Sequence, residues 1–213
     1  MKEKIGTVFS IADDNIPIPG CSVSKQINGF LTYYSLSENT DISAEIYLYH
    51  KLLIVMDGSC KIYGNNGTKK LDTNDCIVTL TDTPVGIKTD TGTVYAEITI
   101  RRTDNMNSVI NAGEVFQLKE LLPYQENKIV NMDVVHNDRM KFALMAFDEG
   151  TGLSEHAAPG EAMVFALDGE AVIGYEGKEH PIKAGEQFVF AKGGIHSVKA
   201  TKKFKMALLL TLE

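Results

Sequence analysis

The amino-acid sequence predicts an all-β chain made of two tandem sandwich or barrel units, with helix as a minor component. Three observations predict this fold class. Apolar and polar residues alternate with a period of two, glycine-containing turn pairs recur at short intervals, and the second half of the chain repeats the pattern of the first. Many short strands joined by tight turns are typical of sandwiches and barrels.

The alternation is clearest near the C-terminus. Apolar residues occupy every second position from Phe204 to Leu212, whereas Lys205 and Thr211 have the opposite parity. The segment from Val94 to Ile100 repeats this pattern, and each segment predicts a strand with one face on a core. The predicted turns between such strands are Asn28-Gly29, Asp57-Gly58, Asn66-Gly67, Asp168-Gly169 and Glu176-Gly177.

One segment has a helical pattern. Between Val115 and Leu122 the leucines stand at helical spacing, and Pro123 then ends the pattern. The sequence therefore predicts one short helix near the start of the second unit.

The two halves align with each other. A shift of 111 positions carries the segment Leu52–Gly58 onto Met163–Gly169, and a shift of 107 carries Val8-Phe9 onto Val115-Phe116. This repeat predicts domains at residues 1–102 and 114–213, joined by a linker at 103–113. We expect residues 114–213 to fold alone, unless the two halves exchange their N-terminal strands.

Composition and charge exclude several classes of function. The 213 residues include 21 Lys and Arg against 28 Asp and Glu, so the net charge is −7 and nucleic acid is not an expected partner. No stretch of about 18 consecutive apolar residues occurs, so we expect no membrane span. The segment from Met1 to Ser10 lacks the hydrophobic stretch of a signal peptide, which predicts a cytoplasmic protein.

The second half contains two recognisable motifs. The segment from Gly152 to Gly169, followed by Gly185-Glu186 and by Gly193-Gly194-Ile195-His196, resembles the two signature motifs of the cupin family. The resemblance covers nearly all of residues 114–213 and, through the repeat, more weakly residues 5–102. It implies a bicupin, in which each half forms a jelly-roll-like, double-stranded β-helix barrel around a ligand-sized cavity.

In cupins the first motif supplies a His-x-His pair and a glutamate, and the second motif supplies a histidine, which together bind a divalent metal. Counting back from the turn glycine Gly169, the glutamate and second histidine positions fall on Ala162 and Ala158. Counting forward from His156 instead, Glu161 becomes a ligand if Pro159-Gly160 forms a bulge. The sequence leaves both registers open.

The resemblance implies a C-terminal ligand site that contains His156, Glu161 and His196. His180 is added to this site because it shares strand parity with Ile182 and is expected to face the same interior. In the bulged register His156, Glu161 and His196 bind one divalent metal, with Mn, Fe, Zn or Ni as the candidates. In the first half the counterparts of His156, Glu161 and His196 are Glu45, His50 and Val85. We therefore expect no metal in the N-terminal barrel, which binds an organic ligand, closes a homodimer or supports the other barrel.

Three hypotheses of function follow. The first is a small-molecule-binding bicupin with its ligand cavity in the C-terminal barrel. The second is a metal-dependent enzyme, an oxygenase, isomerase or lyase, acting on a small polar substrate. The third is that both barrels serve only assembly, in which case neither cavity is functional. Fold alone does not choose among them, and the sequence identifies no catalytic residue.

Overall fold

The structure is a computed structural model that describes residues 4–212. As the sequence predicts, the described chain is nearly all β. Its described residues divide into two compact units. The N-terminal unit comprises Ile11–Asp104 and Ser108–Gln117, and the C-terminal unit comprises the described parts of Met1–Ser10, Asn105–Asn107 and Leu118–Glu213. No helix in residues 4–212 is long and apolar enough to cross a membrane.

The N-terminal unit is a curled sheet of nine strands with the main order β11-β7-β5-β9-β3-β2, to which β4, β6 and β8 are attached. Its helix and strands are α1 (Ile11–Asp14), β2 (Ser22–Gln26), β3 (Leu31–Leu36), β4 (Thr40–Ile46), β5 (His50–Gly64), β6 (Gly67–Asp72), β7 (Asp75–Val78), β8 (Pro84–Thr89), β9 (Thr93–Ile100) and β11 (Val115–Gln117).

The C-terminal unit is a second curled sheet of nine strands with the main order β1-β17-β15-β18-β13-β12-β10, to which β14 and β16 are attached. Its elements are β1 (Val8–Phe9), β10 (Asn105–Met106), the 3-10 helix η2 (Leu118–Glu120), β12 (Ile129–His136), β13 (Met140–Phe147), β14 (Gly152–Ala157), β15 (Glu161–Tyr175), β16 (Lys178–Lys183), β17 (Gln187–Phe190) and β18 (Ile195–Thr211).

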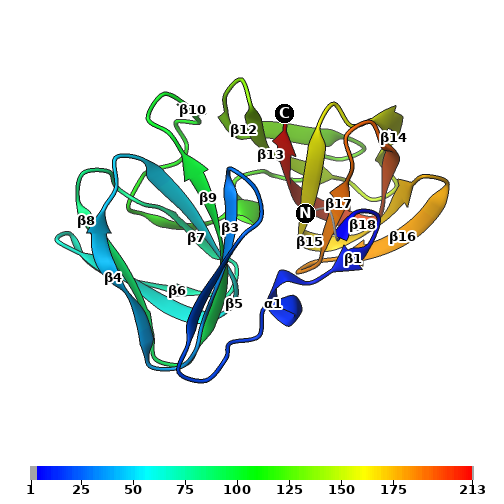
Figure 1. Ribbon diagram of the computed structural model, residues 1–213. Helices are drawn as coiled ribbons and strands as arrows, with labels where there is room; N and C mark the ends of the chain where they lie inside the picture. The colour runs from blue at the N-terminus through cyan, green and yellow to red at the C-terminus, as the bar shows by residue number, and fades with distance from the viewer. Residues whose placement is uncertain (1–3, 213) are drawn as a thin grey trace. The chain divides into compact units, whose positions relative to one another are not determined.

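The first strand of each main order comes from the other half of the sequence. Strand β1 pairs with β17 through Val8↔Phe188, and Figure 1 shows this blue strand among the orange and red strands of the C-terminal unit. Strand β11 pairs with β7 through Val115↔Ile77. The shift of 111 carries Ile77 onto Phe188, so the two short strands hold equivalent places, and each unit is completed by a strand that precedes the other unit in the chain.

The predicted helix is shorter than its pattern suggested. Residues Val115–Gln117 form strand β11, and only Leu118–Glu120 form a turn of 3-10 helix. Residues Val115–Gln117 form hydrogen-bonded strand pairs with β7 instead of a helix, and Pro123 prevents the helix from continuing. The helix α1 was not predicted, although the shift of 107 carries its first residue, Ile11, onto Leu118.

Two predicted turns are instead bends inside long strands. Asp57-Gly58 lies within β5 and Asp168-Gly169 lies within β15, and the pairing register shifts beside each pair. The glycines have φ values of 76° and 73°, a left-handed conformation that favours glycine. The bends allow one strand to contribute to two parts of its curled sheet.

The predicted strands are buried on both faces, whereas the alternation predicted one buried face. In β9, Tyr95 and Glu97 are buried, as are their neighbours Ala96 and Ile98. In β18, Ala207 and Leu209 are fully buried between Met206 and Leu208. Glu97 and Tyr95 therefore belong to the interior of the N-terminal unit rather than to a solvent face.

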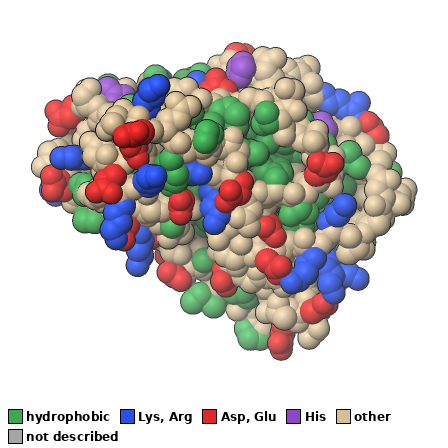
Figure 2. Space-filling view, turned by 180° about the vertical axis from the view of Figure 1, so that it is seen from behind, with side chains coloured by type: hydrophobic (Ala, Val, Ile, Leu, Met, Phe, Trp, Pro, Cys, Tyr) green, Lys and Arg blue, Asp and Glu red, His purple; other side chains and the backbone are tan. Residues whose placement is uncertain are grey.

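The core of the C-terminal unit lies inside its curled sheet. It is rich in aromatic and small side chains, including Phe147, Ala158, Ala162, Val164, Phe188, Phe190, Phe204 and Met206. Acidic and basic side chains are interspersed over the face of the molecule shown in Figure 2.

Candidate functional site

One candidate site is a cavity of about 670 Å³ in the C-terminal unit. It is bounded by the short strand β10 and by β12, β13 and β18. Its lining residues are Asn105, Met106, Asn107, Asn131, Met132, Asp133, His136, Lys141, Ala143, Met145, Leu208 and Leu210.

The pairing register places this cavity on the inner face of the sheet. Ala143 pairs with Asp133 on one side and with Leu208 on the other, and directly paired residues project to the same face. Leu210 pairs with Ala162, a buried core residue, and Leu208 and Leu210 pack against the core cluster. The cavity is therefore a continuation of the unit's interior.

The rim of the cavity is polar. Lys141 Nζ lies 2.8 Å from Asp133 Oδ1, and both side chains are more than two-fifths exposed, so this ion pair adds little stability. Asn107 Nδ2 donates to the carbonyl oxygen of Asp133 at 2.9 Å, and Asn105 Nδ2 lies 3.3 Å from His136 Nε2. The rim thus offers amide, imidazole, ammonium and carboxylate groups above a floor of methionine and leucine.

A pair of histidines lies on the same inner face. His156 on β14 pairs directly with His196 on β18, and their ring centroids are 4.2 Å apart. His156 is exposed, whereas His196 is 7% exposed and stacks on Phe190 at 4.0 Å. The structure therefore brings together two of the histidines that the sequence analysis selected.

The tautomers of both histidines are fixed by backbone carbonyls. Nδ1 of His156 lies 2.8 Å from the carbonyl oxygen of Ser154, and Nδ1 of His196 lies 3.1 Å from that of Gly194. A carbonyl oxygen only accepts, so each Nδ1 donates and each Nε2 carries the lone pair in the neutral ring. Burial lowers the pKa of His196 below its usual range, and His156 lowers it further, whereas the Gly194 carbonyl opposes the shift.

His180 lies apart from this pair. Its ring contacts Phe188 at a centroid distance of 5.0 Å, and Phe188 in turn contacts Phe190, on which His196 stacks. Two phenylalanine rings thus separate His180 from the histidine pair. His180 Nε2 is buried without a hydrogen-bond partner.

Glu161 projects to the opposite face. It pairs with Thr211, whose hydroxyl donates to the Glu161 carbonyl oxygen at 3.0 Å, whereas the next residue, Ala162, is buried in the core. Pro159-Gly160 forms the bend between β14 and β15 rather than a bulge, and a Cβ at residue 160 would meet the carbonyl oxygen of Thr211. This geometry corresponds to the register counted back from Gly169.

The side chains near His156 and His196 do not fit a three-ligand metal site. In that register the two further ligand positions are Ala158 and Ala162, which are 3% and 2% exposed and carry no donor atom. Within residues 4–212 no group of three or more His, Cys, Asp or Glu side chains is placed to hold a metal ion. The donor set therefore consists of two imidazoles.

The comparisons with known proteins agree with the fold. The cupin domain family matches residues 143–212. An oxalate-binding protein from Thermotoga maritima is 31% identical over 129 residues, which cover 59% of this chain and 98% of that protein. The chain belongs to the cupin superfamily.

Solved structures extend the similarity to both units of this cupin. A cupin 2 conserved barrel domain protein from Leptotrichia buccalis is 26% identical, with a TM-score of 0.84 over 98% of this chain and 97% of that one. A salicylate 1,2-dioxygenase from Pseudaminobacter salicylatoxidans is 9% identical, with a TM-score of 0.66 over 98% of this chain and 85% of that one. The second similarity shows a shared fold alone.

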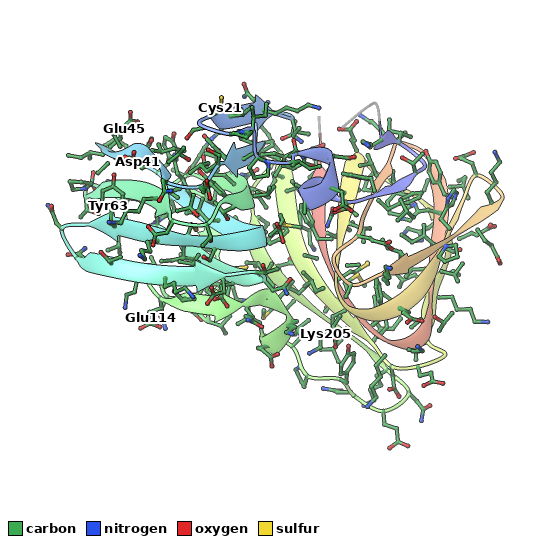
Figure 3. All side chains as sticks on the ribbon, turned by 90° about the horizontal axis from the view of Figure 1, so that it is seen from below. Cys21, Asp41, Glu45, Tyr63, Glu114 and Lys205 are labelled. Atoms are coloured by element: carbon green, nitrogen blue, oxygen red, sulfur yellow. The ribbon has the colours of Figure 1, made fainter. Side chains whose placement is uncertain are left out.

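The sequence analysis missed a buried ion pair in the N-terminal unit. Lys51 Nζ lies 3.3 Å from Glu97 Oε2, and the two side chains are only 10% and 8% exposed. By contrast, Glu45, the counterpart of His156, is exposed and accepts a hydrogen bond from Tyr47 at 2.7 Å (Figure 3). The available signal was the position of Lys51 at the start of a continuous apolar run, where a charged residue requires a partner.

Proposed function

We propose that this cupin binds a small organic molecule in the large cavity of its C-terminal unit. The single observation that carries the proposal is the cavity itself. Its volume of about 670 Å³ lies within the range of roughly 300–1,000 Å³ that is typical of small-molecule sites. The apolar floor suits the body of an organic ligand, and the polar rim suits a head group that forms hydrogen bonds.

We further propose that the chain is a bicupin that arose by duplication. The common strand order of the two units and the equivalent pairings of β1 and β11 support this proposal. The domain boundaries at residues 102 and 114, the cytoplasmic location and the homodimer stay predictions.

The oxalate-binding relative supports a small-molecule ligand of some kind. The cavity is much larger than oxalate, so the ligand proposed here is a larger organic molecule. His156 and His196 offer two Nε2 acceptors on the same inner face, and we include them as secondary ligand contacts.

A metal-dependent enzyme is the second candidate function. The observation that favours it is that both Nδ1 atoms donate to carbonyls, an arrangement that commonly orients metal-binding histidines through Nε2. This function needs a third ligand, which neither Ala158 nor Ala162 supplies.

The cavity can be tested with 8-anilinonaphthalene-1-sulfonate, which has an apolar ring system and one anionic head. We expect one probe molecule to bind per folded chain. Ala143→Phe adds a ring to the inner face and should weaken binding at least ~10-fold. Glu161→Gln, on the opposite face of the same sheet, is the matched control and should leave binding unchanged.

Equal binding by wild type and Ala143→Phe would show that the probe binds elsewhere and would contradict the proposed site. The metal-dependent alternative is tested separately by titrating Mn²⁺, Fe²⁺, Ni²⁺ and Zn²⁺ into wild type and His196→Asn. Tight binding of one ion that is lost in the variant would favour the enzyme.

A further inference from the structure

The interior of the N-terminal unit contains a polar cluster of its own. Leu53 of β5 pairs with Glu97 of β9, and Lys51 lies two residues before Leu53, so Lys51 and Glu97 project to the same inner face. The Lys51 ammonium also lies over the ring of Tyr47, 3.6 Å from its centroid. The ion pair is thus shielded from solvent and flanked by an aromatic ring.

Beside this pair lies a cavity of about 30 Å³, which has room for about two water molecules. Tyr95 lines it and is 1% exposed, yet its hydroxyl has no hydrogen-bond partner. The Tyr95 ring is stacked on Tyr34 at a centroid distance of 4.8 Å, which fixes its position. A buried hydroxyl without a partner is costly, so a ligand or water that pairs with it is favoured.

The unused hydrogen-bonding groups of the cluster are mainly donors. The Lys51 ammonium has three N–H groups, and it contacts one acceptor, Glu97, and one ring face. The Tyr95 hydroxyl adds a further donor. Glu97, in contrast, has carboxylate lone pairs that accept hydrogen bonds, so the site combines unused donors with an adjacent acceptor.

The charges of Lys51 and Glu97 determine which ligands this cluster can bind. Lys51 and Glu97 offset each other, and an additional buried charge would have no partner. The ligand should therefore be uncharged. It should also present an acceptor oxygen next to a donor, because the two charged groups are only 3.3 Å apart.

We propose that the N-terminal unit binds a small uncharged ligand through a primary carboxamide group. The carboxamide oxygen accepts hydrogen bonds from Lys51 and Tyr95, and the amide nitrogen donates to Glu97. The three heavy atoms of this group take the space of the two waters. The remainder of the ligand extends past Tyr47, which is half-buried and hydrogen-bonded to the exposed Glu45.

The position of this site within the fold is informative. The shift of 111 carries Lys51 and Tyr47 onto Ala162 and Ala158 of the C-terminal unit. The two units therefore differ in chemistry at the same place in the barrel, and the carboxamide site is independent of the large cavity proposed above.

The test adds acetamide as the probe to the 213-residue chain and monitors binding by amide chemical shifts in ¹H–¹⁵N NMR spectra. We expect saturable shifts at residues of β5 and β9. Tyr95→Phe removes only the hydroxyl and should weaken binding by roughly 3- to 10-fold. The double variant Lys51→Met with Glu97→Leu removes both charges together, so that no charge is left unpaired, and it should abolish the shifts.

Acetate and methylammonium are close in size to acetamide but charged, and each should bind at least ~10-fold more weakly. Equal binding of acetate would overturn the carboxamide assignment. The site itself would be overturned if acetamide produced no saturable shifts, or if its shifts persisted in the double variant. None of these outcomes depends on whether the C-terminal cavity binds its probe.

Discussion

The interiors of the two units differ although their strands follow the same order. The N-terminal unit fills its inner face with long polar and aromatic side chains, and its cavity next to the ion pair is about 30 Å³. The C-terminal unit has smaller or more flexible apolar residues there, and its cavity is about 670 Å³. The equivalent pairs are Tyr34 and Met145, Tyr47 and Ala158, Lys51 and Ala162, Tyr95 and Met206, and Glu97 and Leu208.

This difference shows how one barrel fold supports two kinds of interior. A lysine is tolerated in the first unit because Glu97 offsets its charge and Tyr47 covers it. In the second unit alanine and leucine at the same places make both the charge and its partner unnecessary.

The largest expected effect comes from breaking the buried ion pair. Lys51→Met leaves Glu97 buried without a partner and should lower the free energy of unfolding by about 3–5 kcal/mol. Lys51→Met combined with Glu97→Leu copies the apolar interior of the C-terminal unit and should restore most of that loss. Denaturant unfolding of the three proteins measures the difference.

The proton equilibrium of Glu97 gives this prediction a second measurable consequence. Burial raises the pKa of Glu97, and Lys51 opposes the shift. Without Lys51 the pKa should rise further, so acidification should reduce the loss in Lys51→Met by protonating Glu97. Equal stability of the single and double variants at neutral pH would show that the pair is solvated rather than buried.

The next largest effect comes from removing β1, the strand that completes the sheet of the C-terminal unit. A chain that begins at residue 11 lacks β1, and therefore loses the pairing with β17 and the packing of Ile5 and Val8 against the C-terminal core. Losing the burial of these two partly buried aliphatic side chains should lower the free energy of unfolding of the C-terminal unit by roughly 2–3 kcal/mol. Hydrogen exchange should become faster in β17 and remain unchanged in the equivalent strand β7.

The matched control is Phe116→Pro, which removes a backbone donor from β11 and should accelerate exchange in β7 instead. Faster exchange in both strands from either change would mean that the two units unfold as one cooperative body. The same logic predicts that residues 114–213 expressed alone are less stable than in the full chain.

The fold could be predicted from the sequence because strand periodicity and the repeat are local patterns. The alternation around Val94–Ile100 and Phe204–Leu212 placed β9 and the C-terminal part of β18. The burial of Tyr95 and Glu97 could not be predicted, because a period of two does not show whether the second face meets water or other side chains. The exchange of β1 and β11 was anticipated only as an alternative, since pairing between distant strands depends on three-dimensional geometry.

The candidate site was predicted less completely than the fold. Motif spacing selected His156 and His196, which lie together, and it also allowed Glu161, which lies on the opposite face. A one-residue shift in register reverses every side chain in a strand, so spacing alone could not decide between the two registers. Most of the cavity lining comes from β10, β12 and β13, which carry no motif, and Leu208 and Leu210 come from the part of β18 that lies outside the motif.

A third prediction tests the register at the histidine pair. Ala158→His combined with Ala162→Glu places an imidazole and a carboxylate on the inner face with His156 and His196. The double variant should bind Zn²⁺ or Mn²⁺ at least ~10-fold more tightly than wild type, about 1.4 kcal/mol. Isothermal titration measures the affinity, and circular dichroism checks that the larger side chains are accommodated. Glu161→Gln should not change the metal affinity. A lower metal affinity in that variant would show that Glu161 is a metal ligand.

The smallest expected effect is the pH dependence caused by His196. Its pKa is lowered in the folded state, so the unfolded chain binds a proton more readily as the pH falls through about 6.5. The free energy of unfolding of the C-terminal unit should therefore have its full value above that pH and decline as the pH falls toward the lower folded pKa. His196→Asn should be less stable than wild type at neutral pH, and its stability should change less between pH 7 and 5. Thermal unfolding and hydrogen exchange in β18 measure both effects. The N-terminal unit has Val85 at this position, so exchange in β8 should keep its pH profile in both proteins. An unchanged slope in His196→Asn would assign the acid sensitivity of the C-terminal unit to another group.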